Sequence, residues 1–279
     1  MNVLHVRYDD PKAPELFARS LRQTGFAVVT NHPIAPELVS SAYGEWERFF
    51  ASGEKLAHRF DPARQAGYFP FRTEKAKGYA VSDLKEFYHY YPQRIRLPEM
   101  AAVHTPALYA QLSQLGAELL GWLEDYTPEH IRCAFSMPLR RMIQNSEETL
   151  LRPIHYPPLS GAEEKDAIRA AEHEDINLIT LLPAATAPGL QVKDTEGRWH
   201  EVSCNPGELV INAGDMLQMV TQGYFSSTPH RVMNPTGAGA ASSRYSMPLF
   251  LHPAPDVRLS KTHTARTYLR ERLAEIGLL

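Results

Sequence analysis

Two short segments restrict the fold of this chain more than any other feature. Residues 171–183 read AEHEDINLITLLP and residues 226–235 read SSTPHRVMNP. The first continues as a β-branched, apolar run that a proline ends, and a proline before His230 favours an extended chain in the second. Side chains two residues apart in an extended segment point to the same side, so His173 and Asp175 can reach one point together. The fold has to bring these two strand-like segments side by side for His230 to join them.

Two imidazoles and one carboxylate form an informative ligand set. It is the facial set of mononuclear Fe(II) sites, and it leaves three coordination positions open for O2 and an organic co-substrate. Zinc sites more often use three or four nitrogen and sulfur ligands. This chain has twelve histidines, so a His-x-Asp pair alone is weak evidence for a metal, and the rest of the sequence has to decide.

A third segment offers a receptor for an acid. Residues 243–251 read SRYSMPLFL, and Arg244 and Ser246 share one face of a strand. The guanidinium fork and the hydroxyl can together hold a carboxylate. A surface Arg and Ser on an edge strand is the plain alternative, but the run is too apolar for an exposed edge. A buried arginine needs an anion, which is either a protein Asp or Glu or a small acid such as 2-oxoglutarate.

Taken together, these segments resemble the isopenicillin-N-synthase-like family of Fe(II)/2-oxoglutarate-dependent oxygenases. The family pattern of HxD, a distal His and RxS occurs here in order. The resemblance extends over nearly the whole chain, through NPGELVINAGDMLQ at 205–218, QGYFSSTPHRV at 222–232 and GFAVVTNH at 25–32. It implies a mainly β fold with flanking α-helices, in which a double-stranded β-helix (jelly roll) lies between N-terminal helices and a C-terminal helix.

The expected organisation is a single oxygenase domain spanning 1–279. Within it we expect an N-terminal helical and substrate-covering part at about 1–148, a jelly-roll catalytic core at about 149–255 and a C-terminal helix at 256–279. Apolar spacing predicts helices, and β-branched runs predict strands. The predicted helices are 14–24, 36–50, 106–126, 128–134 and 264–276, and the predicted strands include 26–30 and 176–182. Residues 61–91 are expected to be irregular with short strands, and 238–243 to be a mobile turn.

The resemblance also implies the cofactors. Fe(II) would be held by His173, Asp175 and His230, with O2 and 2-oxoglutarate as co-substrates. Arg244, Ser246 and Tyr156 would hold the distal carboxylate of 2-oxoglutarate, and no further catalytic residue is expected. Ile154 stands where the family usually has an Asn near the iron-binding end of 2-oxoglutarate, and an isoleucine cannot supply that polar contact. The implied reaction hydroxylates or desaturates a small metabolite while 2-oxoglutarate and O2 become succinate and CO2; the presence of Asp175 argues against halogenation.

Two alternatives stay open at this point. The first is an Fe(II) oxidase or oxidative cyclase of the isopenicillin N synthase or ACC oxidase type, in which the same Arg-x-Ser pair binds the carboxylate of the substrate and no 2-oxoglutarate is used. The second is a non-catalytic jelly-roll binding protein. Oxygen uptake with and without 2-oxoglutarate separates the first from the leading hypothesis, and succinate formation excludes the second.

Substrate residues are less well defined by the sequence. Arg72 and Lys85 are cations among aromatic residues, including Phe71 and Tyr88, in the part of the chain that covers the site in this family. Such a mix suits an anionic group at the edge of an apolar pocket, so we expect a small anionic substrate. The competing interpretation is that both cations are solvated or paired with nearby acidic residues.

Charge and composition limit the possible partners. The net charge is −3 and the pI is about 6.5, so there is no electrostatic footprint for nucleic acid or an anionic membrane. The first residues lack the apolar core of a signal peptide, and two cysteines are too few for a disulfide framework. We therefore expect a cytoplasmic protein that acts on a small molecule and binds neither nucleic acid nor membrane; the sequence leaves its oligomeric state unknown.

Overall fold

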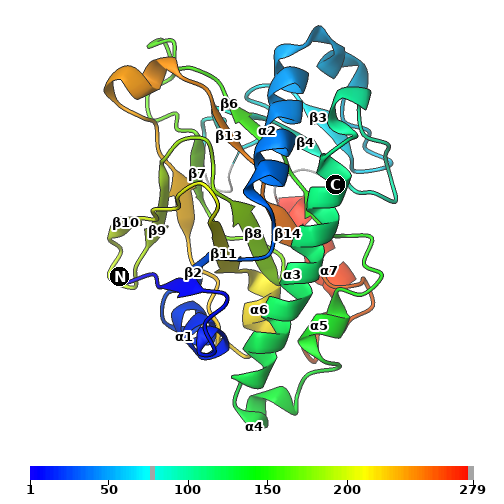
Figure 1. Ribbon diagram of the computed structural model, residues 1–279. Helices are drawn as coiled ribbons and strands as arrows, with labels where there is room; N and C mark the ends of the chain where they lie inside the picture. The colour runs from blue at the N-terminus through cyan, green and yellow to red at the C-terminus, as the bar shows by residue number, and fades with distance from the viewer. Residues whose placement is uncertain (76–78, 276–279) are drawn as a thin grey trace.

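The centre of the protein is built of β-strands, with several helices around them (Figure 1). The computed structural model describes residues 1–75 and 79–275. The largest sheet has six strands, antiparallel except for the first pair. Their order across the sheet is β1 (His5–Arg7), β2 (Phe26–Thr30), β11 (Leu209–Ala213), β8 (Ile179–Pro183), β14 (Leu249–Leu251) and β5 (Leu150–Leu151).

Two smaller antiparallel sheets complete the strand layer. One has the order β10 (Trp199–Glu201), β9 (Leu190–Lys193), β12 (His230–Val232) and β7 (Ala170–His173). The other has the order β13 (Arg244–Ser246), β6 (Ile154–Tyr156), β4 (Glu86–His89) and β3 (Gly67–Phe69). The two histidine segments therefore lie on neighbouring strands, β7 and β12.

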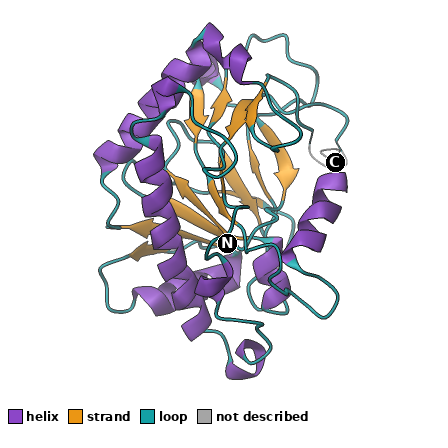
Figure 2. Cartoon of the chain, turned by 90° about the vertical axis from the view of Figure 1, so that its right-hand side faces the viewer, coloured by secondary structure: helices purple, strands orange, loops and turns teal. Residues whose placement is uncertain are grey.

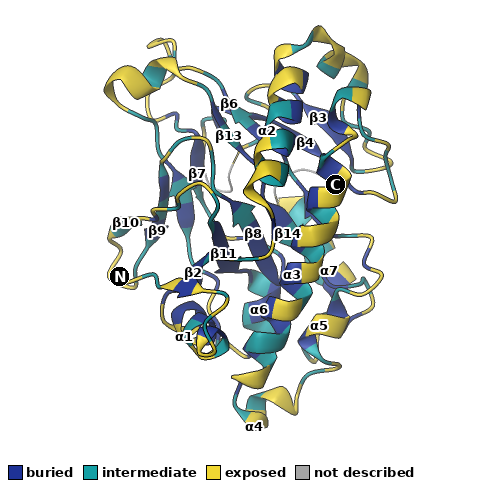
Figure 3. Ribbon diagram, viewed as in Figure 1, coloured by how far each residue is buried: buried dark blue, intermediate teal, exposed yellow. Residues whose placement is uncertain are grey.

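The six-stranded sheet is buried on both faces because its residues alternate between two cores. Val28 and Val210 pack toward Val192 of the four-stranded sheet. The residues next to them in β2 and β11, including Val29 and Ile211, pack toward the helices. The strands β2, β8 and β11 at its centre are accordingly mostly dark in Figure 3. Side chains on the inner face thus point into the space between the sheets.

The helices cover the outer face of the large sheet and the two ends of the molecule. Figure 2 shows the strands in the middle, a column of helices on one side and the C-terminal helix on the other. The α-helices are α1 (Ala13–Thr24), α2 (Pro36–Ala51), α3 (Thr105–Asp125), α4 (Glu129–Arg132), α5 (Leu139–Met142), α6 (Asp215–Val220) and α7 (Ala265–Glu275); the 3-10 helices are η1 (Gly53–His58), η2 (Glu99–Ala101) and η3 (Gly237–Ala241). None of the described helices is long and apolar enough to span a membrane.

Most of the predicted elements are present with shifted ends. The first helix ends where Gly25 adopts a φ of 72°, a conformation that glycine adopts without strain. The strand predicted at 176–182 begins only at Ile179, because the carbonyl groups of Ile176 and Asn177 accept hydrogen bonds from Met216 at the start of α6. The segment 238–243 is mostly a short 3-10 helix. Residue 276, the predicted end of the last helix, lies outside the described residues.

Candidate active site

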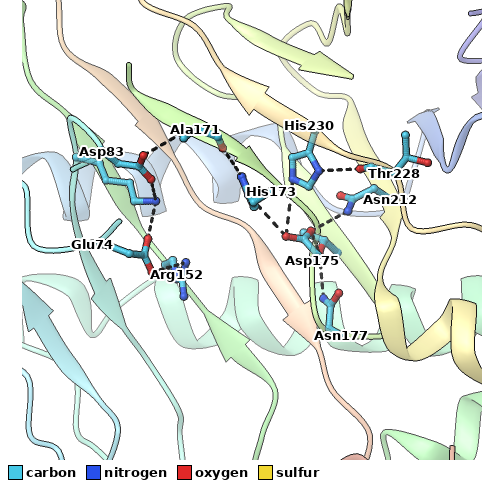
Figure 4. A network of polar contacts seen from close by, with 12 residues as sticks. Glu74, Asp83, Arg152, Ala171, His173, Asp175, Asn177, Asn212, Thr228 and His230 are labelled. Carbon is cyan, nitrogen blue, oxygen red and sulfur yellow. Dashed lines mark hydrogen bonds and ion pairs between the residues drawn. The ribbon is translucent and has the colours of Figure 1, made fainter. Parts of the chain in front are cut away.

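Three side chains converge where β7 and β12 meet. His173 is the last residue of β7 and lies directly opposite His230, the first residue of β12. Asp175 follows in the loop after β7. Its Oδ1 lies 4.0 Å from Nε2 of His173 and 3.7 Å from Nε2 of His230, and one ligand atom from each residue lies within 4.8 Å of the others. Figure 4 shows the three side chains turned toward one another.

The remaining polar atoms of the trio are held so that these ligand atoms stay available. Nδ1 of His173 donates to the carbonyl of Ala171 at 2.8 Å, and Nδ1 of His230 donates to the carbonyl of Thr228 at 3.1 Å. A neutral imidazole that donates through Nδ1 presents its Nε2 lone pair to a metal. Ligand atoms about 2.1 Å from one ion lie roughly 3–3.5 Å apart, so shifts of less than about 1 Å would complete the site. The donor set therefore fits a divalent metal such as Fe(II).

Two neighbouring strands hold the carboxylate. Oδ2 of Asp175 accepts hydrogen bonds from the Thr180 hydroxyl at 2.6 Å and from the Asn212 amide at 2.7 Å. Thr180 on β8 and Asn212 on β11 are direct cross-strand partners, and both are buried. They point to the inner face because they alternate with residues that face the helices. This arrangement orients Asp175 so that Oδ1 faces the two imidazoles.

The protonation states suit metal binding. Burial lowers the pKa of His173 to about 4, and the neighbouring His230 acts in the same direction. Burial alone would raise the pKa of Asp175, but the two imidazoles and the hydrogen bonds from Asn212 and Thr180 outweigh it and hold this pKa below its ordinary value. Near neutral pH the pair therefore offers a neutral imidazole and an ionised carboxylate, the forms that bind metals.

The loop that carries Asp175 is fixed by the start of α6. The Asp215 amide donates to the carbonyl of Asp175 at 2.8 Å. Gly214, one residue earlier, lies so close that a Cβ there would be 2.4 Å from the Asn177 carbonyl oxygen and 2.8 Å from that of Asp175. Real Cβ atoms do not approach so closely, so this contact requires glycine.

A buried ion cluster supports the other end of the site (Figure 4). Asp83 accepts the amide hydrogen of Ala171 at 3.0 Å, and the carbonyl of Ala171 is the group that orients His173. Lys85 lies between two carboxylates, 2.8 Å from Asp83 and 2.6 Å from Glu74. These contacts tie the strand of His173 to the segment before β4.

A small cavity of about 60 Å³ connects the trio with the predicted acid receptor. Strands of all three sheets line this cavity. Its lining includes the trio His173, Asp175 and His230, and also the predicted acid receptor, Tyr156, Arg244 and Ser246. In the register of β13 and β6, Arg244 pairs with Tyr156 and Ser246 pairs with Ile154. The predicted metal ligands and the predicted co-substrate residues therefore share one internal space.

Arg244 lacks a charged partner. Its side chain is buried, with 2% of the residue exposed. Nε donates to the carbonyl of Ala187 at 2.9 Å, and the guanidinium carbon lies 5.0 Å from the centre of the Tyr156 ring. One terminal nitrogen is buried without a hydrogen-bond partner, and no carboxylate of the described chain pairs with the group. A buried guanidinium in this state calls for an anion.

A larger cavity of about 790 Å³ opens on the other side of the trio. His173 and Asp175 form part of its wall, and residues of α7 such as Leu269 and Leu273 form another part. Arg152 lines both this cavity and the small one. A small molecule in the larger space would lie next to the metal ligands.

Of the four predicted substrate residues, only Lys85 lies in the wall of these cavities, and its charge is neutralised by two carboxylates. The structure places the other three away from both cavities. Arg72 pairs with Glu164 instead, and Phe71 is 45% exposed. Tyr88 is fully buried among the aromatic residues between α2 and the third sheet. Phe71 and Arg72 lie between β3 and β4, outside regular strands, so no periodicity predicts their directions. Tyr88 lies on β4.

The sequence did not identify several polar residues around the site. Thr180 and Asn212 support Asp175, Arg152 lies between the cavities, and Arg169 is a second buried guanidinium near Tyr156. Thr180 and Asn212 could have been found, because each is a polar residue at an inward position of an otherwise apolar strand. Arg152 and Arg169 lie outside regular strands, so their directions depend on the folded chain.

Comparison with known proteins identifies the family. A sequence profile of the 2OG-Fe(II) oxygenase superfamily matches residues 142–253, and one of the non-haem dioxygenase in morphine synthesis N-terminal region matches residues 7–109. The proline hydroxylase buaE of Petromyces alliaceus is 30% identical over 263 residues, covering 85% of this chain and 80% of that protein. Gibberellin 2-beta-dioxygenase 2 of Arabidopsis thaliana is 27% identical over 264 residues, covering 89% and 73%.

Solved structures agree over the full length. A proposed oxygenase from Shewanella oneidensis is 48% identical, with a TM-score of 0.90 and complete coverage of both chains. A 2OG-Fe(II) oxygenase family protein from Caulobacter crescentus is 30% identical, with a TM-score of 0.83 and 99% coverage of both. A Neurospora crassa protein solved in complex with alpha-KG and thymine shares the fold at 21% identity and a TM-score of 0.80, covering 98% and 96%. The chain therefore belongs to the 2OG-Fe(II) oxygenase superfamily and is a dioxygenase that uses Fe(II), 2-oxoglutarate and O2.

Proposed function

We propose that His173, Asp175 and His230 bind the Fe(II) of this dioxygenase. The observation that carries the proposal is the hydrogen bonding of these side chains. Each imidazole donates through Nδ1 to a backbone carbonyl, and Asp175 accepts two hydrogen bonds at Oδ2. The other ligand atoms, the two Nε2 atoms and Oδ1, are therefore left to converge on one metal. Bound there, Fe(II) supplies the redox chemistry by which O2 and 2-oxoglutarate become succinate and CO2 while the substrate is hydroxylated or desaturated.

We further propose that Arg244 and Ser246 hold the distal carboxylate of 2-oxoglutarate, with the hydroxyl of Tyr156 as a third donor. The unpartnered nitrogen of Arg244 and the small cavity that joins it to the metal ligands support this assignment. The mostly apolar lining, which includes Leu182 and Val232, would exclude water from the keto acid. The same pocket would fix the distance between the distal carboxylate and the metal.

The β-strand architecture supports a finer description of the fold. We propose that the three sheets form the jelly roll of the family, because strands from all of them line one internal cavity. The chain would then be one oxygenase domain, with its core at about 149–255, an N-terminal part at about 1–148 and a C-terminal part from 256, whose helix α7 begins only at Ala265; the last residues of that range, 276–279, lie outside the described residues. A cytoplasmic location, and the absence of nucleic-acid or membrane partners, remain predictions.

The substrate is proposed to be a small anion, and Arg152 replaces Arg72 and Lys85 as the residue that binds it. Nε of Arg152 is buried without a hydrogen-bond partner. The guanidinium forms an ion pair with Glu74, but the distance from its Nη1 to the carboxylate oxygen is 3.7 Å. The Phe87 and Phe250 rings lie 5.0 and 5.2 Å from its guanidinium carbon and help to fix its position. Arg152 lines both cavities and 19% of its side chain is exposed, so a carboxylate in the larger cavity could pair with its guanidinium.

Two measurements test the assignment of the site. Wild-type protein with Fe(II), 2-oxoglutarate and ascorbate should form succinate, whereas His173→Ala and His230→Ala should not, because each loses a metal ligand. Titration with Mn(II) gives a readout that does not depend on turnover: one ion should bind per wild-type chain and none to either variant. Normal Mn(II) binding by both variants would place the metal elsewhere. Oxygen uptake that is independent of 2-oxoglutarate would favour the oxidase alternative.

The substrate proposal needs a ligand first. Small acids, amino acids and their amides are incubated with the loaded enzyme, and the products are examined by mass spectrometry for a gain of one oxygen or a loss of two hydrogens. The substrate found is then tested with Arg152→Met and with Arg152→Lys, which retains the charge. We expect the Met variant to raise the substrate KM at least about tenfold, the loss of one charge-assisted hydrogen bond, and the Lys variant to raise it less. Equal KM values for wild type and Arg152→Met would contradict the proposal.

A further inference from the structure

A second arginine is buried close to the Arg244 pocket. Arg169 immediately precedes β7, and only 1% of it is exposed. One terminal nitrogen donates to the carbonyl of Ser242 at 3.0 Å, and Nε is buried without a hydrogen-bond partner. No carboxylate in the described chain forms an ion pair with it. The charge of Arg169 is therefore not compensated by a carboxylate of the described chain.

Arg169 and Arg244 lie around the same aromatic ring. Their guanidinium carbons are 5.9 and 5.0 Å from the centre of the Tyr156 ring, so the two charges are separated by roughly 11 Å at most. Burial lowers the pKa of the Arg169 guanidinium, the positive charge of Arg244 lowers it further, and only Tyr156 opposes them. The fold therefore keeps two like charges close together in its interior.

Such a pair is costly for the protein alone. A buried cation is normally paired with an acid, and two cations in a low-dielectric region also repel each other. Protein interiors tolerate the arrangement when an anion arrives to occupy it. The cavity that Tyr156, Arg244 and Ser246 line supplies the space for one end of such an anion. An uncharged ligand end would leave both cations uncompensated.

We propose that Arg169 is a second cation of the co-substrate site, and that together with Arg244 it makes the site specific for a keto acid whose far end carries a full negative charge. This inference rests on the proposed binding of 2-oxoglutarate at Arg244. Arg169 does not line the cavity, so it acts through its field and not by direct contact. It is a positioning and specificity residue, not a catalytic one.

The field of Arg169 gives a measurable expectation. A unit charge roughly 10 Å from a carboxylate, at an effective dielectric constant of about 20, changes an equilibrium constant by about tenfold. It changes the binding of a neutral group of the same shape very little. Arg169 should therefore alter the preference for acid over neutral ligand, whereas a loss of local structure should weaken both ligands alike.

The experiment compares two ligands by calorimetry in the presence of Mn(II). One is 2-oxoglutarate, and the other is 5-methyl-2-oxohexanoate, in which an isopropyl group replaces the distal carboxylate. Wild type is compared with Arg169→Met, which removes the charge, and with Arg169→Lys, the matched control that retains it. The selectivity ratio is the Kd of 5-methyl-2-oxohexanoate divided by the Kd of 2-oxoglutarate. We expect this ratio to fall by about tenfold in the Met variant, mainly because the Kd of 2-oxoglutarate rises, and to fall by less than about threefold in the Lys variant.

Two outcomes would overturn the inference. An unchanged Kd ratio in Arg169→Met would show that the charge does not act on the ligand. An equal loss for both ligands would show that Arg169 only supports the Ser242 loop. If neither variant folds, the ratio of the two Kd values for wild type decides. Two cations require that wild type bind 2-oxoglutarate at least about 100-fold more tightly than 5-methyl-2-oxohexanoate, and a smaller preference rejects the proposal. Failure of wild type to bind 2-oxoglutarate at all would instead reject the proposed function.

Discussion

Replacing Thr180 with Val should weaken metal binding, although Thr180 is not itself a metal ligand. The Thr180 hydroxyl donates to Oδ2 of Asp175 at 2.6 Å and accepts the amide of Asn177 at 3.0 Å. Val has nearly the same shape and is at home in a buried strand, but it has no hydroxyl. The substitution therefore removes one of two hydrogen bonds that orient the carboxylate and leaves the strand in place.

The expected loss can be worked out from these contacts. A hydrogen bond to a charged group contributes about 1.5–3 kcal/mol, and 1.4 kcal/mol corresponds to about tenfold in an equilibrium constant. The Asn212 amide still holds the same oxygen at 2.7 Å, which places the effect toward the lower end. We expect Thr180→Val to bind Mn(II) about 10–30-fold more weakly than wild type, within the range seen when a residue that supports a metal ligand is removed.

The assay is a Mn(II) titration followed by electron paramagnetic resonance, with circular dichroism as the check on folding. Thr180→Ser is the matched control, because it retains the hydroxyl and loses only a methyl group; it should bind Mn(II) within about threefold of wild type. Wild-type affinity in the folded Val variant would refute the reasoning. So would equal weakening in the Ser and Val variants, since the methyl group and not the hydrogen bond would then be responsible.

The site and its surroundings support three further predictions. Gly214→Ala places a Cβ 2.4 Å from a backbone oxygen of the metal-ligand loop and should weaken Mn(II) binding at least about tenfold, whereas Gly121→Ala, with nothing within 4 Å, should leave it unchanged. Arg244→Gln should raise the Kd of 2-oxoglutarate about 30-fold or more, and Ser246→Ala by about 5–30-fold, in calorimetry. Burial lowers the pKa of His252 to about 4, so as the pH falls this histidine is protonated in the unfolded chain before it is protonated in the folded one. The free energy of unfolding should therefore be highest above about pH 6.5 and decrease by up to about 3 kcal/mol toward pH 4. In urea unfolding, the free energy of unfolding of His252→Gln should depend less on pH than that of wild type.

Local patterns in the sequence predict much of the fold. The apolar positions of 106–126 recur at helical spacing, and the helix observed there, Thr105–Asp125, buries the same leucines against the sheet. The strand predicted at 26–30 has the predicted ends. Alternation along strands also predicts that His173 and Asp175 share a face, as do Arg244 and Ser246; the resemblance to the oxygenase family joined these two pairs with His230. In each case the information is local, and packing preserves it.

Two of the substrate candidates that lie away from the cavities, Phe71 and Arg72, belong to a segment without such a pattern. Residues 61–85 contain few regular elements, so neighbours in the sequence turn to different surroundings. Arg72 has a φ of 62°, and its side chain reaches Glu164, which is 92 residues away. Lys85 does face the site, but two acids hold its charge. Nearness in sequence to aromatic residues says little about the direction of a cation when the backbone is irregular.

The residues that support the metal ligands follow a rule that could have revealed them. Thr180 and Asn212 each interrupt an apolar strand, at a position whose neighbours two residues away face the interior. A polar side chain there has to find a partner inside the protein, and two such side chains on adjacent strands suggest a common partner, here Asp175. The rule depends on knowing which strands are neighbours. Arg152 and Arg169 escape it, because each lies just outside a strand end, and only the folded chain shows that their unused nitrogens lie beside the cavities.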